Sequence, residues 1–223
     1  MIHQLICILA FAWCASAAAT TEIPNAQQRL AIVDAHTSIR EVVNPPASNM
    51  QIMNYSMQLE LLAKDFVGQC TQRKPNPNVQ KQYRGFSVTT LVTVGGDYPF
   101  ETMVSTFGDK AVFYDYDKNS CMGDCSVYTQ AVWATTTEVG CAKSRCDGLL
   151  PNEARPTYLL ACMYNPAGNT PNRRPYEMGE ACSKCPAEYK YCQRRQCSKN
   201  SAASTLLSAL TLIFSIVVIY SVA

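Results

Sequence analysis

Cysteine content constrains the fold of this chain more than any other feature of its sequence. Twelve of the 223 residues are cysteines. Cys7 and Cys14 lie in an uncharged stretch, residues 1–19, where an apolar run leads into alanines that fit a signal-peptidase site. The run is too short for a membrane anchor, so we expect a signal peptide over residues 1–19. The ten remaining cysteines then enter an oxidising compartment, which predicts disulfides.

The last segment, residues 200–223, also lacks charged residues. Its apolar run over 206–223 is followed by no basic residue, whereas a spanning helix normally ends in Lys or Arg on the cytoplasmic side. Small residues precede the run, as in a glycosylphosphatidylinositol (GPI) signal, with Asn200 and Ser201 as candidate attachment sites. A GPI signal is favoured over a transmembrane helix. The sequence therefore predicts an extracellular protein that a membrane anchor holds at the cell surface.

The charged residues all lie between these two ends. The net charge is +2, and no basic stripe points to a nucleic-acid partner. Asn54 opens the one N-x-S/T sequence of the chain, so it is a glycosylation candidate.

Hydrophobic periodicity predicts a layered α/β domain. The predicted helices span 25–43, 56–67 and 98–107, with a short helix at 125–133, and the predicted strands span 86–94, 138–142 and 157–164. Asn25 is the expected N-cap of the first helix, and Pro99 is expected near the first turn of the third. Gly140 predicts a close backbone approach, and Gly168 a turn with positive φ. From Pro171 onward the sequence is rich in Pro, Arg and Cys, which predicts a small stapled extension.

Two motifs carry a resemblance to a known family. Tyr128-Thr-Gln-Ala-Val-Trp133, with the following Gly140-Cys-Ala142, resembles the first signature of the CAP superfamily, which includes cysteine-rich secretory proteins and pathogenesis-related proteins. Residues 158–169 resemble the second signature, C-x-Y-x-P-x-G-N, and residues 36–40 and 46–53 match the front of the domain. The likeness is strongest to venom allergen-like proteins of parasitic worms. It implies an α-β-α sandwich, the CAP domain, over residues 25–170, with a small disulfide-rich, hinge-like C-terminal extension over 171–199.

The resemblance also implies how the cysteines pair. Cys182-Ser-Lys-Cys185 opens a segment that is similar to the hinge of cysteine-rich secretory proteins, although C-x-x-C also fits a zinc knuckle or a redox motif. The secretory route disfavours zinc, and no βαβ context supports redox chemistry. The implied pairs are Cys70–Cys146, Cys141–Cys162, Cys182–Cys192 and Cys185–Cys197, which leaves Cys121–Cys125 as the residual pair.

Histidine is too scarce for the metal cavity that is typical of the superfamily. Its members have two histidines and two glutamates there, whereas the matching positions in this chain are Phe86, Lys110 and Val127. His36 is the one histidine outside residues 1–19, and its family counterpart lies on the first helix, away from the cavity. We expect no metal and no cofactor. We also expect no catalytic residue, since a Ser or Cys nucleophile needs a base beside it.

The resemblance further suggests a ligand class. Several members of the superfamily bind sterols through an aromatic loop, and the matching loop here makes Phe113, Tyr114 and Tyr116 lipid-binding candidates. A solvated, tyrosine-rich surface turn is an equally good interpretation of that loop. The favoured function is a non-enzymatic extracellular protein that binds lipid or sterol. The alternative is a protein-interaction module without a small-molecule ligand, and a metal-dependent or proteolytic enzyme ranks third.

Overall fold

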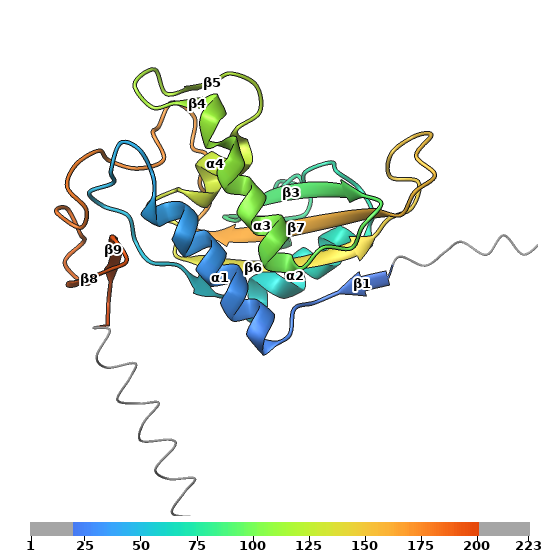
Figure 1. Cartoon of the computed structure of the whole chain (residues 1–223). Coiled ribbons are helices and arrows are strands. Elements are labelled where there is room, and N and C mark those ends of the chain that lie inside the picture. Colours follow the sequence, from blue (N-terminus) through green and yellow to red (C-terminus); the bar gives the residue numbers. More distant parts are fainter. Residues whose placement is uncertain (1–19, 201–223) are drawn as a thin grey trace, which may run out of the picture.

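A five-stranded sheet lies at the centre of residues 20–200, the part of the chain that the computed structural model describes (Figure 1). The strand order is β1 (Thr20–Glu22), β6 (Glu138–Arg145), β7 (Thr157–Asn165) and β3 (Ser87–Val94). These neighbours pair antiparallel, and the short strand β2 (Asn54–Tyr55) pairs parallel with β6. Cys141 of β6 lies opposite Cys162 of β7, and a disulfide joins them.

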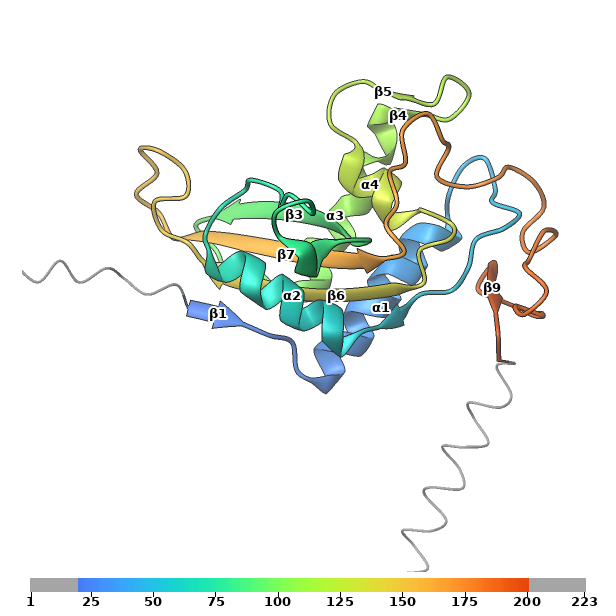
Figure 2. The same ribbon diagram turned by 180° about the vertical axis from the view of Figure 1, so that it is seen from behind.

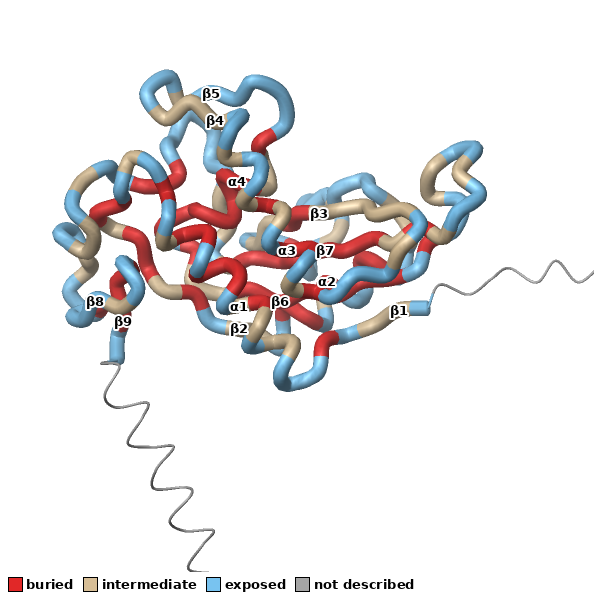
Figure 3. Tube along the Cα trace, in the orientation of Figure 1, coloured by how far each residue is buried: buried red, intermediate tan, exposed pale blue. Residues whose placement is uncertain are grey.

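Helices cover both faces of this sheet. Helices α1 (Ala26–Glu41), α3 (Phe100–Asp109) and α4 (Ser126–Ala131) lie on one face, and α2 (Met57–Gly68) lies on the other (Figures 1 and 2). Each face has its own hydrophobic cluster, and the central strands between them are buried (Figure 3). The architecture is the expected α-β-α sandwich, because the sheet is apolar on both faces and needs a helical layer on each.

Local sequence signals set the starts of the helices. The Asn25 side chain accepts a hydrogen bond from the Gln28 backbone N–H at 2.9 Å, and the Gln28 side chain accepts one from the Asn25 N–H at 2.8 Å. This reciprocal capping box starts α1 as predicted. At the start of α2, the Ser56 side chain accepts a hydrogen bond from the Leu59 backbone N–H at 3.4 Å, without a reciprocal contact. Pro99 is the N-cap of α3 and lies directly before its first turn, which confirms its expected place near the start of this helix.

Strand β6 is three residues longer than predicted because a lysine inside it is buried. The Lys143 side chain is only 6% exposed, and its ammonium lies 2.5 Å from Asp97 and 3.3 Å from Glu22. It also lies 4.9 Å from the centre of the Phe100 ring. A lysine ends a hydrophobic pattern in the sequence, whereas here the two carboxylates compensate for its burial.

The two glycines singled out in the sequence serve close packing. A Cβ on Gly140 would lie 2.3 Å from the Glu60 backbone nitrogen and 2.5 Å from the Ser56 oxygen, which confirms the close approach of α2 to β6. The expected positive φ at Gly168 is wrong. A Cβ there would lie 2.6 Å from the Trp133 ring, so Gly168 is required for contact instead.

The sequence patterns miss several short elements. These are η1 (Lys81–Tyr83), η2 (Lys110–Phe113), the hairpin of β4 (Tyr114–Asp115) and β5 (Ser120–Cys121), and the hairpin of β8 (Tyr191–Gln193) and β9 (Gln196–Ser198). Elements of two to four residues are too short to have a detectable hydrophobic period.

The C-terminal extension is docked on the domain by a buried arginine. Arg40 is 1% exposed and donates from Nη1 to the carbonyls of Ala131, at 2.8 Å, and Trp133, at 3.0 Å. Its Nη2 donates to the Gln51 carbonyl at 2.6 Å, and its Nε to Gln196 Oε1 of β9 at 3.3 Å. Helix α1, the segment after α4 and the extension therefore share one polar centre.

The ten described cysteines form five disulfides, in the expected pairs: Cys70–Cys146, Cys121–Cys125, Cys141–Cys162, Cys182–Cys192 and Cys185–Cys197. Within residues 20–200, no helix has the length and apolar character needed to cross a bilayer. The expected signal peptide, the apolar run over 206–223 and the candidate site Ser201 lie outside the described residues.

Candidate functional site

His36, the one candidate base in the sequence, is a fully buried core residue. Its Nδ1 lies 2.8 Å from the Ile32 carbonyl oxygen, and its Nε2 lies 3.0 Å from the Tyr164 hydroxyl. Because a carbonyl can only accept, Nδ1 carries the proton and Nε2 accepts from Tyr164. Burial lowers the pKa of His36 to about 4, since the imidazolium would lose its hydration. Both ring nitrogens are engaged in the core, so His36 is structural.

The three positions that match the family's metal cavity do not meet in the structure. Phe86 packs against the cluster on the α2 side of the sheet, whereas Val127 packs against the cluster under α1 and α3. Lys110 is exposed, with its ammonium 5.4 Å from the centre of the Phe113 ring. The assignment of Phe86 to a cavity shared with Val127 is therefore wrong. The next residue, Ser87, faces α4, because successive strand residues alternate between faces.

A buried glutamine occupies the region where the signature segments meet. Gln130 Oε1 accepts hydrogen bonds from Ser87 Oγ at 2.6 Å and from the Gly168 N–H at 3.0 Å. Its Nε2 donates to Thr136 Oγ1 at 3.2 Å, and that hydroxyl donates to the Pro166 carbonyl at 2.9 Å. The network joins α4, β3 and the turn after β7. The amide of Gln130 is thus engaged by the protein itself.

The cysteines of the extension do not form a zinc site. Among residues 20–200, Cys182, Cys185 and Cys197 form the one group of three potential ligand side chains within reach of one another, with their sulfurs inside 4.8 Å. All three belong to disulfides. A metal binds the thiolate, so these sulfurs do not fit a zinc knuckle.

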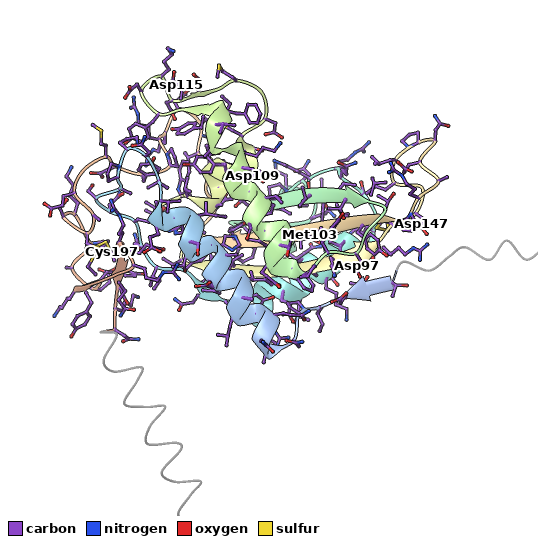
Figure 4. The ribbon with its side chains drawn as sticks, viewed as in Figure 1. Asp97, Met103, Asp109, Asp115, Asp147 and Cys197 are labelled. Atoms are coloured by element: carbon purple, nitrogen blue, oxygen red, sulfur yellow. A yellow bond between two sulfur atoms is a disulfide. The ribbon has the colours of Figure 1, made fainter. Side chains whose placement is uncertain are left out.

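The candidate lipid loop is a protruding hairpin, residues 110–125, whose outer end carries Asp115 in Figure 4. The disulfide Cys121–Cys125 closes its second strand onto α4, and the Met122 N–H donates to the Phe113 carbonyl at 2.8 Å. Three large apolar side chains are exposed on it: Val112 at 74%, Phe113 at 38% and Met122 at 74%.

The tyrosines of the hairpin face inward. Tyr114 lies edge-on to Tyr116, with ring centres 6.3 Å apart, and 6.2 Å from Tyr128 of α4. Tyr116 stacks on Tyr176 at 5.0 Å and donates its hydroxyl to the Tyr176 carbonyl at 2.9 Å. Burial raises the pKa of Tyr114 to about 12 and also raises that of Tyr176. The loop is therefore not a solvated, tyrosine-rich turn, and of the three lipid-binding candidates Phe113 alone is exposed.

A groove of about 570 Å³ lies beside this hairpin, where the chain returns from β7 into the extension. Tyr116 and Trp133 form part of its wall, together with Tyr176. Arg173 and Arg174 line it from the segment that follows β7, which lies beside the hairpin in both views (Figures 1 and 2). No motif in the sequence predicted this site. The adjacent arginines in a stretch without apolar period were the signal that could have indicated it.

A sequence profile of the cysteine-rich secretory protein family, CAP, matches residues 33–164 of the 223 residues. The chain belongs to the CAP family. Human GLIPR1-like protein 1 is 33% identical to it over 204 residues, which cover 87% of this chain and 82% of that protein. Mouse peptidase inhibitor 16 is 31% identical over 172 residues. That alignment covers 76% of this chain but only 33% of the inhibitor, so the chain spans about a third of that relative.

Solved CAP structures support the helminth resemblance. Venom allergen-like protein 4 of Schistosoma mansoni matches with a TM-score of 0.54 and 26% identity, over 70% of this chain and 97% of that one. The sandwich is thus shared with a worm venom allergen-like protein. The five disulfides of this CAP protein are typical of proteins from oxidising compartments.

Proposed function

We propose that this CAP protein is a non-enzymatic extracellular module that contacts lipid through the hairpin of residues 110–125. The observation that carries the proposal is the exposure of Val112, Phe113 and Met122 on one protruding, disulfide-closed segment. A bilayer or a sterol covers such side chains at the cost of little structural change, because Tyr114 and Tyr116 fix the hairpin from behind. His36 is buried, and both of its ring nitrogens are hydrogen-bonded within the core, which supports a role without catalysis.

Vesicle binding tests the proposal directly. Phosphatidylcholine vesicles, with and without cholesterol, are sedimented with the wild-type protein and with the triple variant V112S/F113S/M122S. At about 1 kcal/mol per buried side chain, the variant loses about 3 kcal/mol, or more than 100-fold in partitioning. The matched control replaces Val42, Leu61 and Val79 by serine, since these side chains are 77%, 58% and 77% exposed elsewhere on the surface. Equal binding by the triple variant, or an equal loss in the control, contradicts the proposal.

An extracellular protein is the competing occupant of the hairpin. Crosslinking on intact cells separates the two, because lipid contact yields lipid adducts at Phe113 and Met122. Recovery of one protein partner at these positions, lost in V112S/F113S/M122S while vesicle binding is absent, overturns the lipid assignment.

We also propose that a GPI anchor at Asn200 or Ser201 holds the protein at the cell surface, with a transmembrane helix as the alternative. Support comes from the small residues at 200–203 and the uncharged run after them. Phosphatidylinositol-specific phospholipase is expected to release the protein from intact cells. Retention after the enzyme has released a known GPI-anchored marker refutes the GPI anchor.

A further inference from the structure

The groove beside the hairpin combines an aromatic wall with basic residues. Its aromatic wall is formed by Tyr116, Trp133 and Tyr176. Little of this wall is accessible to a ligand, since Trp133 is 7% exposed and Tyr176 only 3%. Polar groups on the rim are therefore the accessible binding elements, and the basic residues Arg173, Arg174 and Lys184 belong to that rim.

Arg174 is held in place before any ligand arrives. Its Nε donates to the Tyr116 carbonyl at 3.0 Å and its Nη2 to the Asp117 carbonyl at 2.8 Å. The guanidinium carbon lies 5.3 Å from the centre of the Tyr116 ring. Two of its five N–H groups are used in this way, and the others remain to bind an anion. A guanidinium fixed by stacking and hydrogen bonds loses little entropy when it binds an oxyanion.

The positive charge of the groove is only partly neutralised. Among the residues that the structure describes, no carboxylate pairs with Arg173 or Arg174. Lys184 pairs with Glu177 at 3.0 Å, an exposed contact that an incoming anion can share. Three cations therefore face one carboxylate.

One carboxylate of the adjoining turn, that of Asp115, is paired with Lys118. Asp115 accepts from the Lys118 ammonium at 2.8 Å and from its backbone N–H at 3.0 Å. Its hydrogen bond, with a smaller contribution from Asp117, raises the pKa of Lys118. Lys118 thus neutralises Asp115, and neither carboxylate of the turn forms an ion pair with Arg173 or Arg174 among the described residues.

We propose that this groove binds the sulfate or phosphate ester group of an organic ligand. Arg174 supplies fixed N–H donors, Arg173 a second guanidinium and Lys184 long-range attraction, while the sugar or glycerol part of the ligand lies against Tyr116. The site uses different residues from the lipid-contacting side chains Val112, Phe113 and Met122. It can therefore be confirmed or refuted independently of the proposed function.

The ester can belong to a soluble sugar or to a lipid headgroup. Galactose 3-sulfate distinguishes these two sources, because it can be offered either as a free glycoside or as the headgroup of sulfatide. The probes are methyl galactoside 3-sulfate, unsulfated methyl galactoside, sulfatide vesicles and galactosylceramide vesicles. The wild-type protein is expected to bind the free sulfated sugar with a Kd below about 1 mM at low salt and the unsulfated sugar more than 10-fold more weakly. Stronger binding to sulfatide vesicles identifies a lipid source, whereas binding to the free sugar alone identifies a soluble one.

Substitutions assign the binding to the groove. Arg173→Gln is expected to weaken binding of the sulfated sugar about 5- to 10-fold, and R173Q/K184Q further, because Glu177 is then unpaired. R84Q/K64Q removes the same charge at exposed positions outside the groove and is expected to bind as the wild type does. Unchanged thermal melting shows that the variants fold.

Three results overturn the proposal. They are the absence of saturable binding of any sulfated probe, equal binding of sulfated and unsulfated probes, and equal weakening by R173Q/K184Q and R84Q/K64Q. None of them depends on V112S/F113S/M122S. Failure of lipid binding with retained binding of the sulfated sugar therefore contradicts only the proposed function. Failure of sugar binding with retained lipid binding contradicts only the anion site.

Discussion

Acidification is expected to destabilise this protein through His36. The pKa of His36 is about 4 in the folded chain, against an ordinary value of 6.5, because burial disfavours the imidazolium. The unfolded chain therefore binds the proton more readily, and stability present above pH 6.5 is lost as the pH falls toward 4. The whole difference is about 3 kcal/mol, at about 1.4 kcal/mol per pH unit, and about 2 kcal/mol of it falls between pH 7 and pH 5.

Urea unfolding at pH 7 and pH 5 measures this loss. The comparison variant is His36→Gln, whose amide can still donate to the Ile32 carbonyl and accept from the Tyr164 hydroxyl. Aspartate and glutamate residues titrate alike in both proteins, so the difference between them isolates the imidazole. The free energy of unfolding of the wild type is expected to fall by about 2 kcal/mol more than that of the variant. Equal pH dependence, or a His36 ring signal that titrates near pH 6.5 in the folded protein, refutes the reasoning.

Three further substitutions test the packing. Gly140→Ala places a Cβ 2.3 Å from the backbone of α2, and we expect a loss of at least about 3 kcal/mol in thermal or urea unfolding; a change below about 1 kcal/mol contradicts this. Arg40→Met leaves several buried carbonyls without a donor, and we expect the free energy of unfolding to fall by about 3–5 kcal/mol. Limited proteolysis is expected to cleave the extension of this variant earlier than that of the wild type. Glu60→Gln weakens the pair with Arg29, at 2.7 Å, and the contact with the Tyr55 hydroxyl, at 2.8 Å, and should cost about 2 kcal/mol; an unchanged melting temperature would rule out a stabilising pair.

One interaction between close neighbours in the sequence, the cap of the first helix, was predictable at single-residue precision. The capping box at Asn25 needs only Gln28 three residues later, so the start of α1 follows from the sequence. Interactions between distant segments were not. Lys143 ends a strand pattern in the sequence, yet it lies inside β6 because Asp97 and Glu22 reach it from other elements.

The candidate site shows the same division. The family resemblance identified the loop and its aromatic residues, but neither the hairpin that it forms nor which side chains face solvent. Tyr114 and Tyr116 turn inward because Tyr128 and Tyr176 supply partner rings from α4 and the extension. Likewise, Phe86 and Ser87 differ by one position, and only the register of β3 against β7 places the serine toward α4.

By itself the sequence determined the family, the sandwich, the N-cap of the first helix and the shortage of histidine, because each depends on composition or on short, ordered motifs. Tertiary structure alone decided that His36 is buried away from solvent and that the extension docks through Arg40. It also decided that Arg173 and Arg174 line the same groove as Tyr116. These contacts join residues far apart in the chain. Their partners are chosen by burial and hydrogen-bond geometry, which no local pattern records.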